Sequence, residues 1–395
     1  MTRAEPRRER DPAVVGLVDE TRHVAVYRWA LLPPSETFIR TEALALRRYT
    51  PIFVGGYREP GLELPVDRVV VALPGRRLQR AIRRRLPGYD PHARLIRMCR
   101  ASGVRLVHAH FGYEGLGALR LARALGVPLT VKFHGFDATM TDDALLAAGG
   151  TTAEYVQRRA ELFEGATLLI GVSHFITDEL RRRGAPDSKL RVHHVGVPLS
   201  APPPGPERDP VVLFVGRHIE KKGLGDLVDA MAIVRASVPS ARLVVVGDGP
   251  LRAQHEARAR ELGIAAEFIG WLPPDGVTAQ LQRARVLCVP SRRAQNGDAE
   301  GMPTVIPEAG ACGLPIVATR HSGIPEALAD ERGGLLADEG DVDAIARHLA
   351  AVLSDGELWR RLSEGARENI RVNFDPERQA QQLERLFDEA LRRRG

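Results

Sequence analysis

Short apolar segments rich in β-branched residues alternate with longer amphipathic segments along most of this chain. The short segments predict buried strands, and the longer ones, apolar at every third or fourth position, predict helices. Strands that alternate with helices are typical of a parallel sheet covered by helices. The pattern therefore predicts the α/β fold class.

The expected strands and helices form two series. In the first half the expected strands are residues 23–29, 51–55, 69–72, 105–108, 129–133, 167–172 and 190–194, with helices at 36–48, 116–125 and 153–163 among them. In the second half the expected strands are 211–215, 242–246, 267–269, 286–289 and 316–318, and the expected helices are 224–236, 251–262, 304–313, 342–353 and 376–394.

A proline-rich segment separates the two series. Residues 199–209 read Leu-Ser-Ala-Pro-Pro-Pro-Gly-Pro-Glu-Arg-Asp, a composition that neither helix nor sheet tolerates. A chain of 395 residues also exceeds the usual limit for one hydrophobic core. We therefore expect a flexible extension at 1–20, Rossmann-like domains at 21–198 and 210–374 joined by the linker 199–209, and a closing helix at 375–395.

The composition is that of an ordinary soluble globular protein, with 44% hydrophobic and 27% charged residues. No stretch approaches the roughly 20 apolar residues of a membrane span, and the charged first ten residues do not resemble a signal peptide. Cys99, Cys288 and Cys312 are far apart and lack metal-ligand spacing. These features exclude a secreted disulfide scaffold and an integral membrane protein, and they predict a cytoplasmic protein.

Arginine dominates the positive charge, because lysine occurs only at positions 132, 189, 221 and 222. Many of the arginines cluster between Arg76 and Arg100, where apolar residues at 78, 81, 82 and 86 follow the spacing of an amphipathic helix. Such a helix can lie on an anionic membrane surface, although a solvated helix face explains the same pattern. Nucleic acid is not expected as a partner, because no aromatic residues interleave the arginines.

Two glutamates eight positions apart, Glu300 and Glu308, are the most informative feature of the chain. The first lies in the loop after the expected strand 286–289, and the second lies in the first turns of the following helix. In an open α/β sheet this crevice is where ligands bind, and the main-chain N–H groups of Met302, Thr304 and Val305 would favour an anion there. Acids near a helix start also occur simply because they complement the helix dipole.

A second segment carries two cations on one loop. Strand 211–215 runs into Gly216, Arg217 follows it directly, and Lys222 comes five residues later, just before a helix that we expect to begin at 223 or 224. Two such cations can grip a diphosphate and neutralise charge that grows on it as it leaves. A solvated loop would also explain them.

Tight turns follow the next two strands. Gly247, Asp248 and Gly249 form one turn, and Trp271 and Leu272 follow the other strand. Backbone groups of these turns could hold a base. The dinucleotide-binding fingerprint is absent, since Arg252 stands where its third glycine should be, and no Walker motif occurs.

Taken together, these motifs resemble the donor half of family 4 glycosyltransferases, retaining enzymes of GT-B fold, over residues 211–327. The resemblance implies two Rossmann-like domains that face a central cleft, with the C-terminal helix crossing back to the first domain. It also implies that Arg217 and Lys222 bind the donor diphosphate with the Met302–Val305 backbone nearby. Glu300 would contact the transferred sugar, and Glu308 would hold the ribose hydroxyls.

The first half carries matching motifs. In Val-Lys-Phe-His-Gly-Phe-Asp, the family's sugar-contacting histidine corresponds to His134. The segments around Ser35 and Glu36, around His108 and His110, and at 321–326 resemble the bacterial exopolysaccharide subgroup, which includes colanic acid glycosyltransferases. These four residues are therefore expected near the sugar or acceptor, although both histidines could instead be structural. The chain departs from many relatives after its first strand, where it lacks a glycine-rich loop.

The resemblance implies transfer of a hexosyl unit from a nucleotide sugar, expected to be a UDP-sugar, to a glycan or lipid-linked acceptor. We expect catalysis by His134, Arg217, Lys222 and Glu300, without a cofactor or a metal, because two fixed cations would replace the metal. The alternatives are glycosylation of a small natural product, a sugar-nucleotide epimerase or phosphorylase of similar fold, or an inactive nucleotide-sugar-binding subunit.

Overall fold

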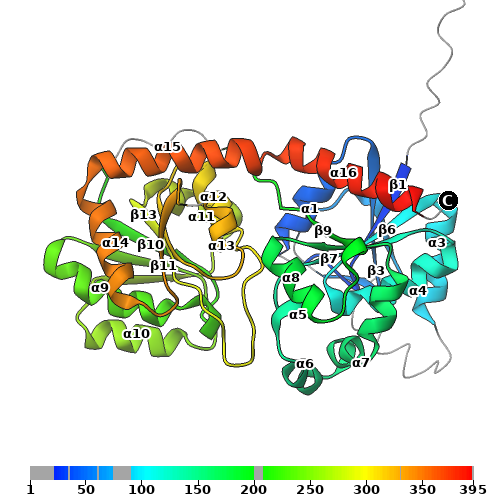
Figure 1. The fold of residues 1–395 in the computed structure, drawn as a ribbon, viewed down its shortest axis with the longest axis horizontal. Helices are drawn as coiled ribbons and strands as arrows, with labels where there is room; N and C mark the ends of the chain where they lie inside the picture. Colours follow the sequence, from blue (N-terminus) through cyan, green and yellow to red (C-terminus); the bar gives the residue numbers. More distant parts are fainter. Residues whose placement is uncertain are drawn as a thin grey trace, which may run out of the picture.

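The structure is a computed structural model that describes residues 22–33, 36–59, 62–73, 90–199, 208–329 and 331–393. The expected extension at 1–20, Ser35, most of the linker and the arginine-rich segment at 76–86 lie outside the described residues. Two parallel sheets, each with helices packed on it, make up the two halves of the molecule, as Figure 1 shows. The predicted fold class is confirmed.

The sheet of the first half has seven strands in the order β5-β3-β1-β6-β7-β8-β9. These strands are β1 Arg22–Tyr27, β3 Tyr49–Gly55, β5 Val69–Val71, β6 Val104–His110, β7 Leu129–Phe133, β8 Leu168–Gly171 and β9 Leu190–Val192, with a separate pair β2 Ala30–Leu31 and β4 Tyr57–Arg58. The helices are α1 Thr37–Leu44, α3 Pro91–Ala101, α4 Gly112–Leu125, α5 Phe136–Thr139, α6 Asp142–Ala148, α7 Gly150–Gly165 and α8 His174–Arg182.

The sheet of the second half has six strands in the order β12-β11-β10-β13-β14-β15. They are β10 Val211–Val215, β11 Arg242–Val246, β12 Ala266–Gly270, β13 Val286–Val289, β14 Ile316–Thr319 and β15 Gly334–Ala337. The helices are α9 Leu224–Ser237, α10 Arg252–Glu261, α11 Pro274–Arg283, α12 Val305–Ala311, α13 Ile324–Ala327, α14 Val342–Ser354, α15 Gly356–Asn373 and α16 Pro376–Arg392.

Strands β10 and β13 of the second sheet are apolar along their length because both of their faces are buried. In β10, Val212 and Phe214 belong to the core on one side of the sheet, whereas Leu213 belongs to the core on the other side. Successive side chains of a strand point to opposite faces, so a strand covered on both faces reads as a near-continuous apolar run. This explains why the sequence pattern identifies these strands so clearly.

The C-terminal helices connect the two halves. Helix α15 packs on the second half, the Phe374 carbonyl accepts a hydrogen bond from Val197 N at 2.8 Å, and α16 then lies along the first half (Figure 1). Leu383, Phe387 and Ala390 of α16 are buried together with strand residues of the first sheet. The predicted crossing of the C-terminal helix is thus confirmed.

Some expected boundaries differ from the structure. The helix expected at 36–48 ends at Leu44, because the backbone N–H groups of Arg47 and Arg48 donate to Glu384 of α16, at 2.7 and 2.6 Å, instead of continuing the helix. The strand expected at 105–108 extends to His110, so both histidines of that motif are strand residues. Among the described helices, none is long and apolar enough to cross a bilayer.

Candidate functional site

The predicted cation Lys222 and the predicted acid Glu300 meet in the structure. Lys222 Nζ lies 2.8 Å from Glu300 Oε1, and the two side chains are 17% and 9% exposed. Lys222 ends a short 3₁₀ turn after β10, whereas Glu300 lies in the long loop after β13. These adjacent strands of a parallel sheet bring the two residues together although 78 positions separate them in the chain.

A glycine makes this approach possible. Gly223 has a φ of 63°, and a Cβ at this position would lie 1.8 Å from the carbonyl oxygen of Pro290, directly after β13. Only glycine allows both this backbone conformation and this contact. The turn that carries Lys222 is therefore seated on the end of the strand that leads toward Glu300.

Arg217 precedes this turn and is exposed. No ion pair or side-chain hydrogen bond of its guanidinium is found among the residues that the structure describes. The structure therefore places the backbone of Arg217 at the end of β10, beside the Lys222 turn, and leaves its side chain open to solvent. A guanidinium in this position is available to an incoming anion.

His321 and Glu339 hold Glu300 in place. The backbone N–H of Glu300 donates to His321 Nε2 at 3.1 Å, and His321 Nδ1 lies 2.6 Å from Glu339 Oε1. Burial by itself raises the pKa of Glu300, but the ammonium groups of Lys222 and Lys221 outweigh burial and leave that pKa below its ordinary value. Glu300 is therefore an ionised carboxylate on a fixed backbone.

The loop of Glu300 touches the predicted sugar-contacting histidine of the other half. A Cβ on Gly301 would lie 2.0 Å from the carbonyl oxygen of His134, and one on Gly135 would lie 3.1 Å from Gly301 N. Two glycines, one from each half, thus let the two backbones approach. In this arrangement His134 and Glu300 lie on opposite walls of the same interdomain contact.

A small cavity lies at this contact. It has a volume of about 90 Å³, and His134 and Phe38 of the first half line it together with Met302, Thr304 and Pro307 of the second. Met302 packs against the cores of both halves. Two of the three residues whose backbone is predicted to bind phosphate, Met302 and Thr304, therefore line the cavity with His134. The third, Val305, is the first residue of helix α12.

Glu308 lies one turn into α12 and is partly buried. Burial raises the pKa of this carboxyl, and a hydrogen bond from the Thr304 side chain opposes that rise. Glu308 therefore belongs to the second half, and it lies close to Thr304 at the start of the same helix.

The turns predicted near the nucleotide lie beside the Arg217 loop. Gly216 N donates to Val246 O at 3.0 Å, His218 N donates to Asp248 O at 2.9 Å, and Gly247 N donates to Gly270 O at 2.8 Å. A Cβ on Gly249 would lie 2.7 Å from His218 O. Trp271 and Leu272 follow Gly270, and Trp271 is 65% exposed. The successive strand ends thus form one continuous edge.

A buried polar network lies behind His134. Its Nε2 lies 3.0 Å from His110 Nδ1, and burial lowers the pKa of both rings well below the ordinary value. His110 and His108 in turn face Glu42 of α1, and Glu42 is bonded to Lys132 of β7. His110 thus backs the candidate site, whereas His108, bonded to Thr130 at 2.8 Å, fits the structural alternative.

Glu42, His108 and His110 have the spacing of a metal site, with ligand atoms within 4.8 Å of one another. The ammonium of Lys132, however, already occupies one oxygen of Glu42. A second cation beside it would meet strong repulsion in a buried setting. The chemistry of this cluster therefore does not fit a resident metal ion.

Glu36, which we expected near the sugar or acceptor, is paired inside the first half. Its carboxylate holds Arg28, which also bonds to Glu114 Oε1 at 2.6 Å and to the hydroxyl of Tyr113 at 3.1 Å. All three charged groups are buried. In this structure Glu36 orients Arg28 and does not join the group around Glu300.

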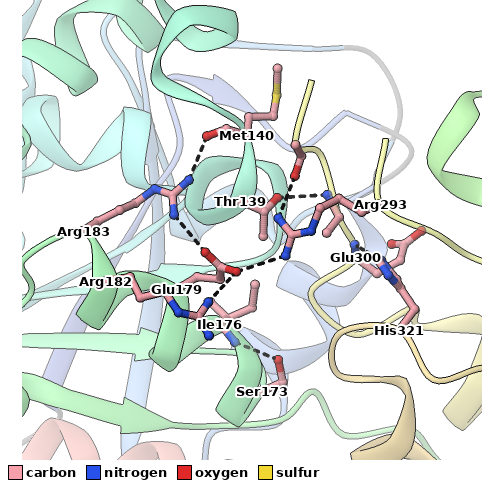
Figure 2. A network of polar contacts seen from close by, with 12 residues as sticks. Thr139, Met140, Ser173, Ile176, Glu179, Arg182, Arg183, Arg293, Glu300 and His321 are labelled. Atoms are coloured by element: carbon pink, nitrogen blue, oxygen red, sulfur yellow. Dashed lines mark hydrogen bonds and ion pairs between the residues drawn. The ribbon is translucent and has the colours of Figure 1, made fainter. Parts of the chain in front are cut away.

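The two halves are joined by further polar contacts next to the site. Figure 2 shows Glu179 of α8 bonded to Arg182 and Arg183 of the same half and, at 3.1 Å, to Arg293 of the β13–α12 loop. The Thr139 hydroxyl accepts from Ala299 N at 3.0 Å (Figure 2). Glu326 of α13 also accepts the first backbone N–H groups of α8, at 2.9 and 3.2 Å. The loop of Glu300 is therefore held from both sides.

Sequence reasoning missed Glu42, Lys132 and Glu339. One signal could have found Lys132. The chain has only four lysines, and each makes a specific contact: Lys221 bonds to Asp298 at 2.8 Å, Lys222 to Glu300, Lys132 to Glu42, and Lys189 to the carbonyl of Glu164 at 2.5 Å. In a chain that otherwise uses arginine, a retained lysine marks a place that needs a compact ammonium group.

Two protein families match this chain. The family described as "Glycosyltransferase Family 4" matches residues 37–201, and "Glycosyl transferases group 1" matches residues 199–369. Together these matches span both halves of the molecule. Their meeting point, at residues 199–201, coincides with the start of the proline-rich segment.

Three curated relatives are named for the biosynthesis of colanic acid or amylovoran. The protein named "Putative colanic acid biosynthesis glycosyltransferase WcaL" of Salmonella typhimurium is 31% identical over 71% of this chain and 69% of its own length, and WcaL of Escherichia coli K12 is 32% identical over 68% and 66%. The amylovoran biosynthesis glycosyltransferase AmsK of Erwinia amylovora is 32% identical over 63% of this chain and 61% of its own. The alignments thus span about two thirds of these relatives.

Solved structures share the whole fold. A sucrose-phosphate synthase from Thermosynechococcus elongatus has a TM-score of 0.73 at 21% identity and covers 94% of this chain and 100% of its own. HepE of Anabaena, solved with UDP and glucose, has a TM-score of 0.72 at 17% identity and covers 93% and 100%. At these identities the likeness shows the two-domain fold alone.

Proposed function

Because the chain belongs to the group 1 glycosyltransferases of family 4, enzymes of EC class 2.4, we propose that it retains the configuration of a hexosyl unit while moving it from a nucleotide-diphosphate sugar to an acceptor hydroxyl. The acceptor that we propose is a glycan or a lipid-linked oligosaccharide of cell-surface polysaccharide synthesis. The names of WcaL and AmsK, which refer to colanic acid biosynthesis and amylovoran biosynthesis, support this choice.

One observation carries the proposal. The Lys222–Glu300 ion pair lies on one wall of the interdomain contact, and the next residue, Gly301, touches the His134 backbone on the other wall. A cation for a leaving phosphate, an ionised acid for the sugar and a group from the opposite domain are thereby assembled at one place. Together these groups could stabilise the charges that develop when a diphosphate leaves a sugar.

The proposed chemistry is mostly electrostatic. Departure of the diphosphate leaves positive charge on the sugar ring and adds negative charge to the phosphate oxygens. Lys222 and Arg217 would stabilise the leaving charge, and the ionised Glu300 would lie near the positive ring. The acceptor hydroxyl enters on the side from which the phosphate leaves, so the phosphate can take its proton and no protein base is required. No metal is needed in this scheme.

The donor half would hold the nucleotide along the edge formed by the strand ends. The ribose would bind Glu308, and the base would lie by the turns at 247–249 and 270–272. We propose a uridine nucleotide, and the binding of UDP by HepE, a protein of similar fold, supports it. Guanosine donors should be the first to be compared with uridine donors, because one mycobacterial relative is named for its dependence on GDP-mannose.

A donor panel tests the function. Purified protein is incubated with UDP- and GDP-sugars, with and without a lipid-linked oligosaccharide acceptor, and the products are identified by mass spectrometry. Transfer should require the acceptor, and the anomeric linkage should match that of the donor. Donor turnover that needs no acceptor would instead indicate an epimerase or phosphorylase, and binding without turnover would indicate an inactive subunit.

We also propose that the arginine-rich segment between Arg76 and Arg100 contacts an anionic membrane surface, as a basic amphipathic helix would. Flotation with vesicles that contain phosphatidylglycerol should recover the protein, whereas vesicles of phosphatidylcholine alone should not. Equal recovery with both vesicles would contradict this contact.

A further inference from the structure

His134 and His110 form a hydrogen bond in which the neighbouring groups determine which ring donates. Their ring nitrogens Nε2 and Nδ1 lie 3.0 Å apart, and both rings are neutral because burial lowers their pKa values well below the ordinary value. A neutral imidazole carries one proton on one of its two nitrogens. One ring must therefore donate and the other must accept, and the choice determines which nitrogen of His134 is left for a ligand.

The network behind His110 determines that choice. The carbonyl of Gln379 in α16 can only accept, so His193 donates to it from Nε2, at 2.9 Å, and keeps a lone pair on Nδ1. The ammonium of Lys132 can only donate, and it donates to that Nδ1 at 2.7 Å and to Glu42 Oε2. The direction of each of these hydrogen bonds is therefore fixed, because Gln379 O can only accept and Lys132 Nζ can only donate.

The last link is the ionised carboxylate of Glu42. Burial by itself would raise its pKa, but Lys132 and the neighbouring histidines together outweigh burial and leave the pKa well below the ordinary value. Its other oxygen, Oε1, is buried and faces two rings, at 3.6 Å from His108 Nε2 and 3.9 Å from His110 Nε2. A carboxylate oxygen favours an N–H group that faces it and disfavours a lone pair.

His110 is therefore protonated on Nε2 and accepts on Nδ1, so His134 donates from Nε2 and keeps a lone pair on Nδ1. His134 lines the interdomain cavity with Met302 and Thr304. We propose that Glu42 is a positioning residue that acts through His110 to make His134 Nδ1 a hydrogen-bond acceptor for a hydroxyl of the bound sugar. The identity of that ligand rests on the proposed function; the tautomer does not.

A single substitution should reverse the direction of the relay. In Glu42→Gln, Lys132 can bond only to the amide oxygen, so the amide NH₂ must face the histidines. His110 would then accept on Nε2 and donate from Nδ1, and His134 would accept on Nε2. The His134 ring would now carry its proton on Nδ1 and offer a donor in place of an acceptor.

The test is nuclear magnetic resonance of the full chain labelled with ¹⁵N-histidine, without any ligand. Two-bond proton–nitrogen correlations show which ring nitrogen is protonated, and loss of one ring signal set in His134→Gln assigns His134. We expect Nε2–H in the wild type and Nδ1–H in Glu42→Gln. The matched control is Thr130→Val, which removes the bond to His108 but leaves the path through His110, and it should show the wild-type tautomer.

Nδ1–H in the wild type, or an unchanged tautomer in Glu42→Gln, would overturn the proposal. If Glu42→Gln does not fold, the wild-type spectrum alone decides. Because no donor is used, this result is independent of whether the donor panel finds transfer. Once a donor is known, kcat/KM should fall about tenfold or more in Glu42→Gln, as expected when a hydrogen-bond acceptor is replaced by a donor, and should stay within about twofold in Thr130→Val.

Discussion

The contact between Gly301 and His134 makes a sharp prediction about domain closure. In Gly301→Ala the new Cβ would lie 2.0 Å from the His134 carbonyl oxygen and 2.7 Å from Val172 Cγ2. Ordinary contact begins at 3.4 Å, so the two backbones must separate by about 1.4 Å. Since the first atom belongs to the backbone, no side-chain rotation can relieve the clash.

The separation should impair catalysis rather than nucleotide binding. A misplacement of about 1 Å between groups that act together costs on the order of 10²-fold, or about 2.7 kcal/mol of transition-state stabilisation. We therefore expect kcat/KM for transfer to fall about 10²-fold in Gly301→Ala. Calorimetry should show nearly unchanged binding of UDP, because Arg217, Lys222 and Glu308 all belong to the second half.

The matched control is Gly225→Ala in α9, where a Cβ would meet no atom within 4 Å. In a helix this substitution removes backbone freedom from the unfolded chain, so thermal stability should stay equal or rise. Turnover of Gly225→Ala should equal that of the wild type. If Gly301→Ala kept transfer within about threefold of the wild type, the interdomain contact would have no part in catalysis and the reasoning would be refuted.

The remaining predictions concern charge. Lys222→Ala and Glu300→Gln should each lower kcat about 10²-fold or more, as the loss of transition-state charge contacts does. The control Lys189→Ala, far from the site in the chain, should not lower kcat. Near-normal turnover in both site variants would contradict the roles given to Lys222 and Glu300. EDTA should leave transfer unchanged, and loss that magnesium or manganese restores would show that two fixed cations do not replace a metal. The free energy of unfolding in urea should fall between pH 7 and pH 5.5 by at least about 1.2 kcal/mol, the share of one buried histidine. Burial lowers the pKa of His193 to about 3, so only its unfolded form takes up a proton as the pH falls below 6.5; a flat profile would contradict this burial.

The donor half was largely predictable because its information is local. Strands β10, β11 and β13 have the bounds that the sequence predicts, since a strand covered on both faces reads as a near-continuous apolar run. Lys222 and Glu300 lie in the loops that follow β10 and β13, and the carboxyl ends of parallel strands meet at one edge of the sheet, so their convergence could be expected. Short strands with few β-branched residues, such as β15, carry too little pattern to be recognised.

The support behind the site was not predictable in the same way. Glu42 and Lys132 are 90 residues apart, and neither breaks its local pattern strongly enough to reveal a buried ion pair. Glu36 lies in a segment that resembles a family motif, yet its carboxylate pairs with the buried Arg28. Such pairings depend on which helix packs on which strand, and a hydrophobic pattern does not specify that.

The most direct test of the central claim is a crystal structure of the full chain with its nucleotide-sugar donor. The account predicts that the pyrophosphate contacts Lys222 and Arg217 while the sugar lies between Glu300 and His134. A pyrophosphate bound elsewhere, for example in the groove of about 450 Å³ between α9 and α10, would contradict it.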